Sequence, residues 1–198
     1  MLRKLHPNPT SERLIEITVN LIDENGGLQG VNLRKIAKLA GCAHTNVYNY
    51  FQNFEGLLWA ALERILERWL QYTEEQEQGS PDLEPDTFLA RVIASQLDFA
   101  LEHSGWYRFI WLEPLSGSPP PEVMEILQKM QINFIDMLKS LSIGTHDHEH
   151  MERVSTIIHG YLHGEICKVI NGRASRREKY RSNIIVNTQT LLKLLTSA

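Results

Sequence analysis

Hydrogen-bonding side chains crowd one short stretch of the sequence, AGCAHTNVYNYF, which runs from Ala40 to Phe51. The stretch contains two asparagines, two tyrosines, a threonine and a histidine, and only Val47 and Phe51 are plainly suited to a core. Residues four apart share one face of a helix, so these two would anchor the stretch and leave its polar side chains outside. Asparagine can bind adenine through two hydrogen bonds, threonine can contact a thymine methyl group, and tyrosine can donate to a phosphate. The pattern favours recognition of bases and phosphates.

A second short helix is expected just before this stretch. Asn32 is a suitable N-cap for LRKIAKLA, and Gly41 ends that helix. Two short helices joined by a turn that holds glycine form a helix-turn-helix motif, whose second helix enters the major groove of DNA. The net charge of the chain is −4. The segment from Asn32 to Phe54 is nevertheless basic, because it carries no acid and its charged residues are Arg34, Lys35 and Lys38.

On these residues the chain resembles the TetR family of transcriptional regulators. The pattern runs through LIEITVNLIDENGG and then through VNLRKIAKLAGCAHTNVYNYFQNFEGLL. Three positions depart from it: Ala43 stands where the family usually has a capping serine, Asn46 is more polar than is common, and Phe54 stands where the family usually has a lysine that meets a phosphate. The motif and the resemblance together predict a DNA-binding surface made of Asn32, Arg34, Lys35, Ala43, His44, Thr45, Asn46, Tyr48, Asn49 and Tyr50.

The resemblance implies a homodimeric repressor that binds double-stranded operator DNA and is released from it by a small molecule. Helical periodicity continues to the C-terminus without a convincing strand, so the expected fold class is all-α. We expect a three-helix helix-turn-helix domain over residues 1–53 and a helical ligand-binding and dimerisation domain over residues 54–198. The expected helices begin near Thr10 or Ser11, at Asn32, after Gly41, after Asn53, and then cover about 86–103, 104–113, 121–141, 147–171 and 175–196.

The predicted helix over residues 147–171 is apolar on two faces, which indicates burial on two sides. Gly160 and Gly164 lie four residues apart and would let another helix approach the backbone closely. In a protein of this size, that pattern predicts a second copy of the chain packed against the last two helices. The predicted dimer interface consists of Ile157, Gly160, Gly164, Leu191 and Leu195.

A set of aromatic and aliphatic residues could line an effector pocket between helices. Aromatic side chains at helical spacing are also ordinary core residues, and both roles can hold at once. The set carries no charge, so the expected effector is a small hydrophobic molecule. Its members are Trp59, Leu62, Leu66, Phe99, Trp106 and Trp111.

No nucleophile–base arrangement, glycine-rich phosphate loop or zinc-protease motif is present, so we expect neither an enzyme nor a cofactor. The N-terminal MLRKLHPNPTSER lacks the apolar run of a secretory signal. No stretch approaches the roughly 18–20 apolar residues of a membrane helix. We therefore expect a cytoplasmic protein without a membrane partner.

Two alternative functions stay open at this point. The histidines of HDHEH, or His159 and His163 with Cys167, could make a metal-responsive regulator of the same fold. Alternatively, the chain could be a helical dimeric interaction module that has lost DNA binding, as Phe54 in place of the usual lysine would favour.

Overall fold

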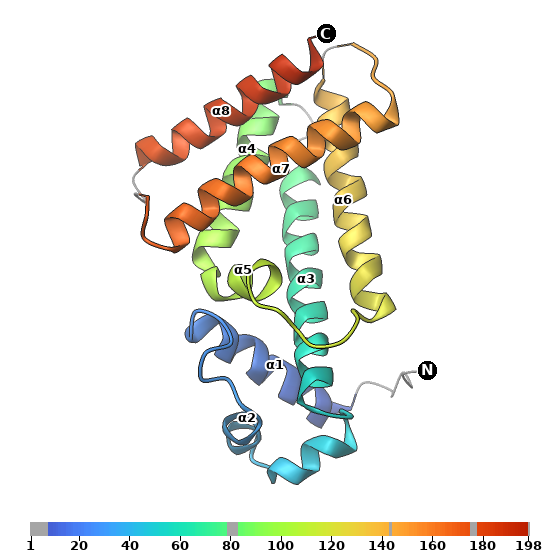
Figure 1. Ribbon diagram of the computed structural model, residues 1–198, viewed down its shortest axis with the longest axis vertical. Coiled ribbons are helices and arrows are strands. Elements are labelled where there is room, and N and C mark those ends of the chain that lie inside the picture. Colours follow the sequence, from blue (N-terminus) through green and yellow to red (C-terminus); the bar gives the residue numbers. More distant parts are fainter. Residues whose placement is uncertain (1–7, 79–82, 143, 175–177, 198) are drawn as a thin grey trace. The chain divides into compact units, whose positions relative to one another are not determined.

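The computed structural model describes residues 8–78, 83–142, 144–174 and 178–197, and all regular structure in these ranges is helical (Figure 1). This confirms the predicted all-α class. The described chain divides into two compact units: unit 1 comprises Met1–Arg68 and His103–Ile126, and unit 2 comprises Trp69–Glu102 and Leu127–Ala198. The predicted boundary after residue 53 does not coincide with this division, and the assignment of DNA binding to residues 1–53 stays a prediction. The helices are α1 (Pro9–Glu24), α2 (Leu33–Ala40), η1 (His44–Asn49), α3 (Phe54–Gln78), α4 (Pro85–Glu102), α5 (Ser104–Trp111), α6 (Pro121–Leu141), α7 (His148–Ile170) and α8 (Glu178–Thr196).

Helix α1 begins at Pro9 and its N-cap is Asn8, two residues before Thr10, the earlier of the two expected caps. The side chain of Asn8 accepts a hydrogen bond from the Thr10 amide at 2.9 Å, and Pro9 occupies the first helical position. A fixed φ near −65° suits proline to that position, and asparagine is a strong N-cap, so this pair outcompetes Thr10 and Ser11 as the start. The prediction that the N-terminal segment is not a secretory signal rests largely on residues 1–7, which lie outside the described residues.

Helix α2 has the boundaries that the sequence predicts. The Asn32 side chain accepts a hydrogen bond from the Lys35 amide at 3.0 Å and caps the helix. Gly41 ends it in the left-handed conformation, with φ of 71°, which costs glycine little because it has no Cβ. Helix α3 also starts where the sequence predicts, because the Asn53 side chain caps it by accepting a hydrogen bond from the Gly56 amide at 2.8 Å.

A cluster of charged side chains joins α3 to α1 inside unit 1. Arg64 on α3 donates to Glu12 at 2.6 Å and also to Glu16, which pairs with Arg68 as well. The hydrogen bond to Glu12 is the largest of the influences that raise the pKa of Arg64 above its ordinary value. Beneath this cluster, the two helices bury Leu14, Val19, Ile22, Leu57, Ile65 and Leu66 completely.

Helix α5 packs closely on the C-terminal end of α1. A Cβ atom on Gly105 would lie 2.3 Å from the Ile22 carbonyl oxygen and 2.7 Å from the Asp23 Cα, so only glycine fits. Beside it, the buried Trp106 indole donates to the Val19 carbonyl at 2.9 Å. His103 Nδ1 lies 2.6 Å from Asp23 Oδ2. These contacts hold α5 and α1 together as one part of unit 1.

In unit 2, α7 and α8 run side by side (Figure 1) and both pack against α4. Arg181 on α8 makes two hydrogen bonds to the Asp98 carboxylate on α4, at 3.0 and 2.6 Å. Tyr180 donates to Glu165 on α7. The expected start of the last helix at Ser175 lies outside the described residues. Within the described ranges, no helix combines the length and the apolarity needed to cross a membrane.

Candidate nucleic-acid interface

The stretch from His44 to Asn49 forms a 3₁₀ helix, η1, where the sequence predicts a short helix of unspecified type. Ala43 precedes η1, and no side chain caps its first turn. The Asn46 amide donates to the Ala43 carbonyl at 2.9 Å, and the Tyr50 amide donates to the Val47 carbonyl at 3.0 Å. Both bonds span three residues, as a 3₁₀ helix requires. The missing cap at Ala43 is consistent with this tighter, shorter element.

The side chains of η1 follow the predicted pattern except at Asn46, which was expected to face outward and is half-buried. Val47 is only 1% exposed and anchors η1, and Phe51 is half-buried. Tyr48 is 53% exposed. Side chains three apart align in a 3₁₀ helix, and Asn49 accordingly donates to the Asn46 side-chain oxygen at 2.6 Å. The exposed polar residues are His44, Thr45, Tyr48 and Asn49, while Asn46 and Tyr50 are half-buried.

Helix α2 adds positive charge next to η1. Arg34, Lys35 and Lys38 are all exposed, and none of the residues from 32 to 54 is acidic. The first acid after this segment is Glu55. Asn32 has a structural task, because its oxygen caps α2 and its amide donates to the Gly30 carbonyl at 3.2 Å. Phe54, at the position of the family's lysine, is half-buried. The surface therefore offers cations that can bind phosphates. It also offers amide and hydroxyl groups that can bind base edges.

The residues predicted to line an effector pocket lie in both units. Leu62, Leu66 and Trp106 are buried in unit 1. In unit 1, Trp111 is 37% exposed, and the Trp59 indole donates to the Ser116 carbonyl at 3.3 Å. In unit 2, Phe99 stacks on Trp69 with ring centroids 5.2 Å apart. Several of these side chains belong to the hydrophobic core, and the effector pocket that they were expected to line stays a prediction.

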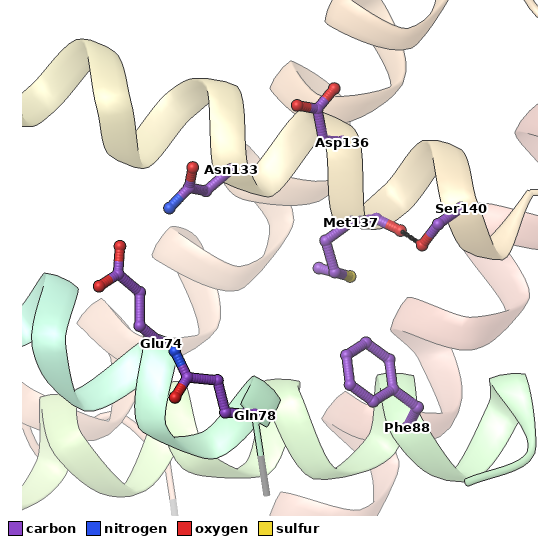
Figure 2. Close-up of a pocket in the computed structure, with 7 residues that line it drawn as sticks. All are labelled: Glu74, Gln78, Phe88, Asn133, Asp136, Met137 and Ser140. Carbon is purple, nitrogen blue, oxygen red and sulfur yellow. Dashed lines mark hydrogen bonds between the residues drawn. The ribbon is translucent and has the colours of Figure 1, made fainter. Parts of the chain in front are cut away.

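Unit 2 contains a cavity that the sequence does not reveal. Its volume is about 540 Å³, and it lies between α3, α4 and α6 (Figure 2). Hydrophobic periodicity identifies the inner face of each helix but not the place where three helices diverge. Most lining residues are polar and lie at the edges of those inner faces. They are Glu74, Gln78, Phe88, Asn133, Asp136, Met137 and Ser140.

The predicted dimer face of α7 is open in the single chain. An added Cβ on Gly160 or on Gly164 would meet no atom within 4 Å, and Ile157 is 46% exposed. On α8, Leu191 and Leu195 are half-buried. The more exposed apolar residues of α8 are ones that the sequence analysis missed, Val186 at 56% and Leu194 at 69%.

The histidine and cysteine side chains of α7 interact in pairs. His163 Nε2 lies 3.5 Å from Cys167 Sγ, and the His159 and His163 rings are nearly parallel with centroids 6.3 Å apart. In the ranges that the structure describes, no three His, Cys, Asp or Glu side chains are grouped to hold a metal ion.

Comparison with known proteins places these features in context. No family model matches the chain. The chain is 31% identical over 93 residues to the HTH-type transcriptional regulator RutR of Escherichia coli K12, a match that covers 47% of this chain and 42% of RutR. The matched part thus spans less than half the length of that relative.

Solved structures match over nearly the whole chain. A TetR-family transcriptional regulator from Streptomyces coelicolor aligns with a TM-score of 0.76 and 19% identity, covering 98% of this chain and 84% of that one. The regulator FadR from Bacillus subtilis, solved in complex with stearoyl-CoA, aligns with a TM-score of 0.66 and 21% identity, covering 94% and 97%. These likenesses confirm the resemblance drawn from the N-terminal residues, and the chain has the fold of TetR-family transcriptional regulators.

Proposed function

We propose that this chain is a DNA-binding transcriptional regulator of the TetR type, in which η1 enters the major groove of an operator. The polar outer face of η1, fixed by the buried Val47 and flanked by the cations of α2, carries this proposal. The similarity to RutR lends support, because that relative is an HTH-type transcriptional regulator. The protein would act in the cytoplasm as a binding protein rather than an enzyme.

The basic residues of α2 give a first test. Replacing Arg34 by alanine should weaken DNA binding, because Arg34 is exposed next to η1 and would neutralise a phosphate. Each phosphate contact contributes about −0.9 to the slope of log K against log salt, so the slope should become shallower by about one unit. Gel-shift titrations over a salt series measure both effects.

Lys139→Ala is the matched control for that variant. Lys139 is an exposed cation on α6 in unit 2, outside both η1 and the proposed dimer face. Its removal changes the net charge equally and should leave the salt slope unchanged. Equal slopes for Arg34→Ala and the unaltered protein would remove Arg34 from the interface.

We further infer a homodimer through α7 and α8. Gly160→Leu with Gly164→Leu should convert the dimer into monomers, because bulky side chains would hold a partner helix away from the backbone. Neither new side chain meets an atom of its own chain near its Cβ, so the protomer should stay folded. Sedimentation velocity measures the change, and circular dichroism checks the fold.

Gln128→Leu, which adds an exposed leucine on α6 instead, is the control for a general effect of surface hydrophobicity. It should remain dimeric. A stable dimer in the double glycine variant would place the interface elsewhere on the chain.

The regulator would be a repressor that a small ligand releases from DNA. A ligand can do this only if it binds better to the state that does not fit the operator. FadR from Bacillus subtilis was solved in complex with stearoyl-CoA, and this supports a ligand-binding role for the present chain, which shares the fold. The alternative interaction module, which the half-buried Phe54 would favour, predicts no specific DNA affinity.

A further inference from the structure

We propose that the cavity of unit 2 binds a small organic cation, an amine or ammonium compound with an apolar or aromatic part. This ligand differs from the uncharged hydrophobic effector that the sequence predicts for another set of residues, and that earlier pocket stays a prediction. The role of such a cation as effector rests on the proposed function, whereas its binding to the cavity does not. The evidence lies in the charge of the lining, its apolar part and its size.

Both ionisable side chains among the lining residues are acids, Glu74 on α3 and Asp136 on α6. Asp136 is exposed, and it makes no hydrogen bond or ion pair with any described residue. Glu74 accepts from Lys129 at 2.8 Å through one carboxylate oxygen, and both side chains of that pair are substantially exposed. Counting Lys129 with the two acids leaves one negative charge, so the cavity attracts a cation and repels an anion.

The remaining lining suits the uncharged part of such a ligand. Figure 2 shows Phe88 and Met137 on one side of the cavity, with Glu74, Gln78 and Asn133 on the other. Met137 is 7% exposed, so its side chain forms an apolar wall. An aromatic ring attracts cations through its face, and Phe88 can supply this contact besides apolar area. The amides of Gln78 and Asn133 provide hydrogen-bond acceptors for N–H groups.

The size of the cavity fits a small molecule. Its volume of about 540 Å³ lies within the roughly 300–1,000 Å³ of typical ligand sites. A carboxylate of equal size would gain the same apolar contacts but would face Glu74 and Asp136. Charge should therefore decide between ligands of equal shape.

Three probes of one skeleton isolate this effect: phenethylamine, which is a cation at neutral pH, phenethyl alcohol and 3-phenylpropionate. Isothermal titration calorimetry of the full chain without DNA measures their affinities. We expect the amine to bind about two- to fivefold more tightly than the alcohol and the carboxylate to bind most weakly, since a solvent-exposed charge pair contributes on this order.

Variants of the lining residues test whether the preference for the amine arises in the cavity. Asp136→Asn and Glu74→Gln should each lower the affinity for the amine about two- to fivefold and leave that for the alcohol unchanged. Phe88→Leu should lower the affinity of the cavity for both the amine and the alcohol. Glu125→Gln removes an exposed acid of α6 that does not line the cavity and should change nothing.

Each contrary outcome overturns the proposal. These outcomes are no binding of the amine at millimolar concentration, a carboxylate that binds as tightly as the amine, or an Asp136→Asn variant with an unaltered preference. Gel shifts in the absence of any ligand test DNA binding separately. A protein that binds the amine but no DNA would retain this cation site and lose the proposed function.

Discussion

Gly105→Ala is expected to destabilise the protein by about 1–3 kcal/mol, the range for forcing an extra methyl group into a packed site. The new Cβ would lie 2.3 Å from the Ile22 carbonyl oxygen and 2.7 Å from the Asp23 Cα. Both are backbone atoms, so no side-chain rotation relieves the overlap, and α5 must move away from α1. Urea unfolding followed by circular dichroism should show a lower transition midpoint.

Gly56→Ala is the control, because it is also a helical glycine and its added Cβ would make only an ordinary contact, 3.6 Å from the Asn53 side-chain oxygen. Alanine has the higher helix propensity, so this variant should match or exceed the stability of the unaltered protein. If Gly105→Ala unfolds at the same urea concentration as Gly56→Ala, the close packing of α5 on α1 is wrong.

The second large effect is expected on DNA affinity. Asn46→Ala combined with Asn49→Ala should reduce specific binding by about a hundredfold or more, because each lost base contact costs about 1–3 kcal/mol. In the free protein, Asn49 donates to the Asn46 side chain at 2.6 Å, and binding would exchange this bond for bonds to bases. Affinity for unrelated DNA should hardly change, since neither side chain is charged.

Gel shifts with specific and unrelated DNA at one salt concentration separate these effects. Gln131→Ala, which removes an exposed amide side chain of α6 outside the proposed dimer face, serves as the control. Loss of both affinities together in the double variant would indicate damage to η1 rather than lost base contacts.

The sequence predicts most elements because their determinants are local. The start of α2 depends on one side chain, Asn32, and its end on the conformational freedom of Gly41. The inward orientation of Val47 follows from apolar spacing alone. In α1, two candidate caps close together obscured the true one, Asn8, which lies before Pro9 and outside the apolar pattern.

Features that depend on several helices at once escaped the sequence analysis. The cavity of unit 2 combines residues as distant as Glu74 and Ser140, and no local pattern indicates that three helices diverge there. The exposure of Val186 and Leu194 likewise depends on which face of α8 packs against α4 and α7. The fit of Gly105 against the end of α1 is a contact between segments about eighty residues apart in the sequence.

The central claim, sequence-specific DNA binding through η1, is tested most directly by one titration. The unaltered protein is titrated against the DNA that flanks its own gene and against a scrambled fragment of equal length, at physiological salt. A specific regulator should bind the first at least about a thousandfold more tightly, the lower end of the usual ratio. Equal affinities for the two fragments, or no binding to either, would contradict the account.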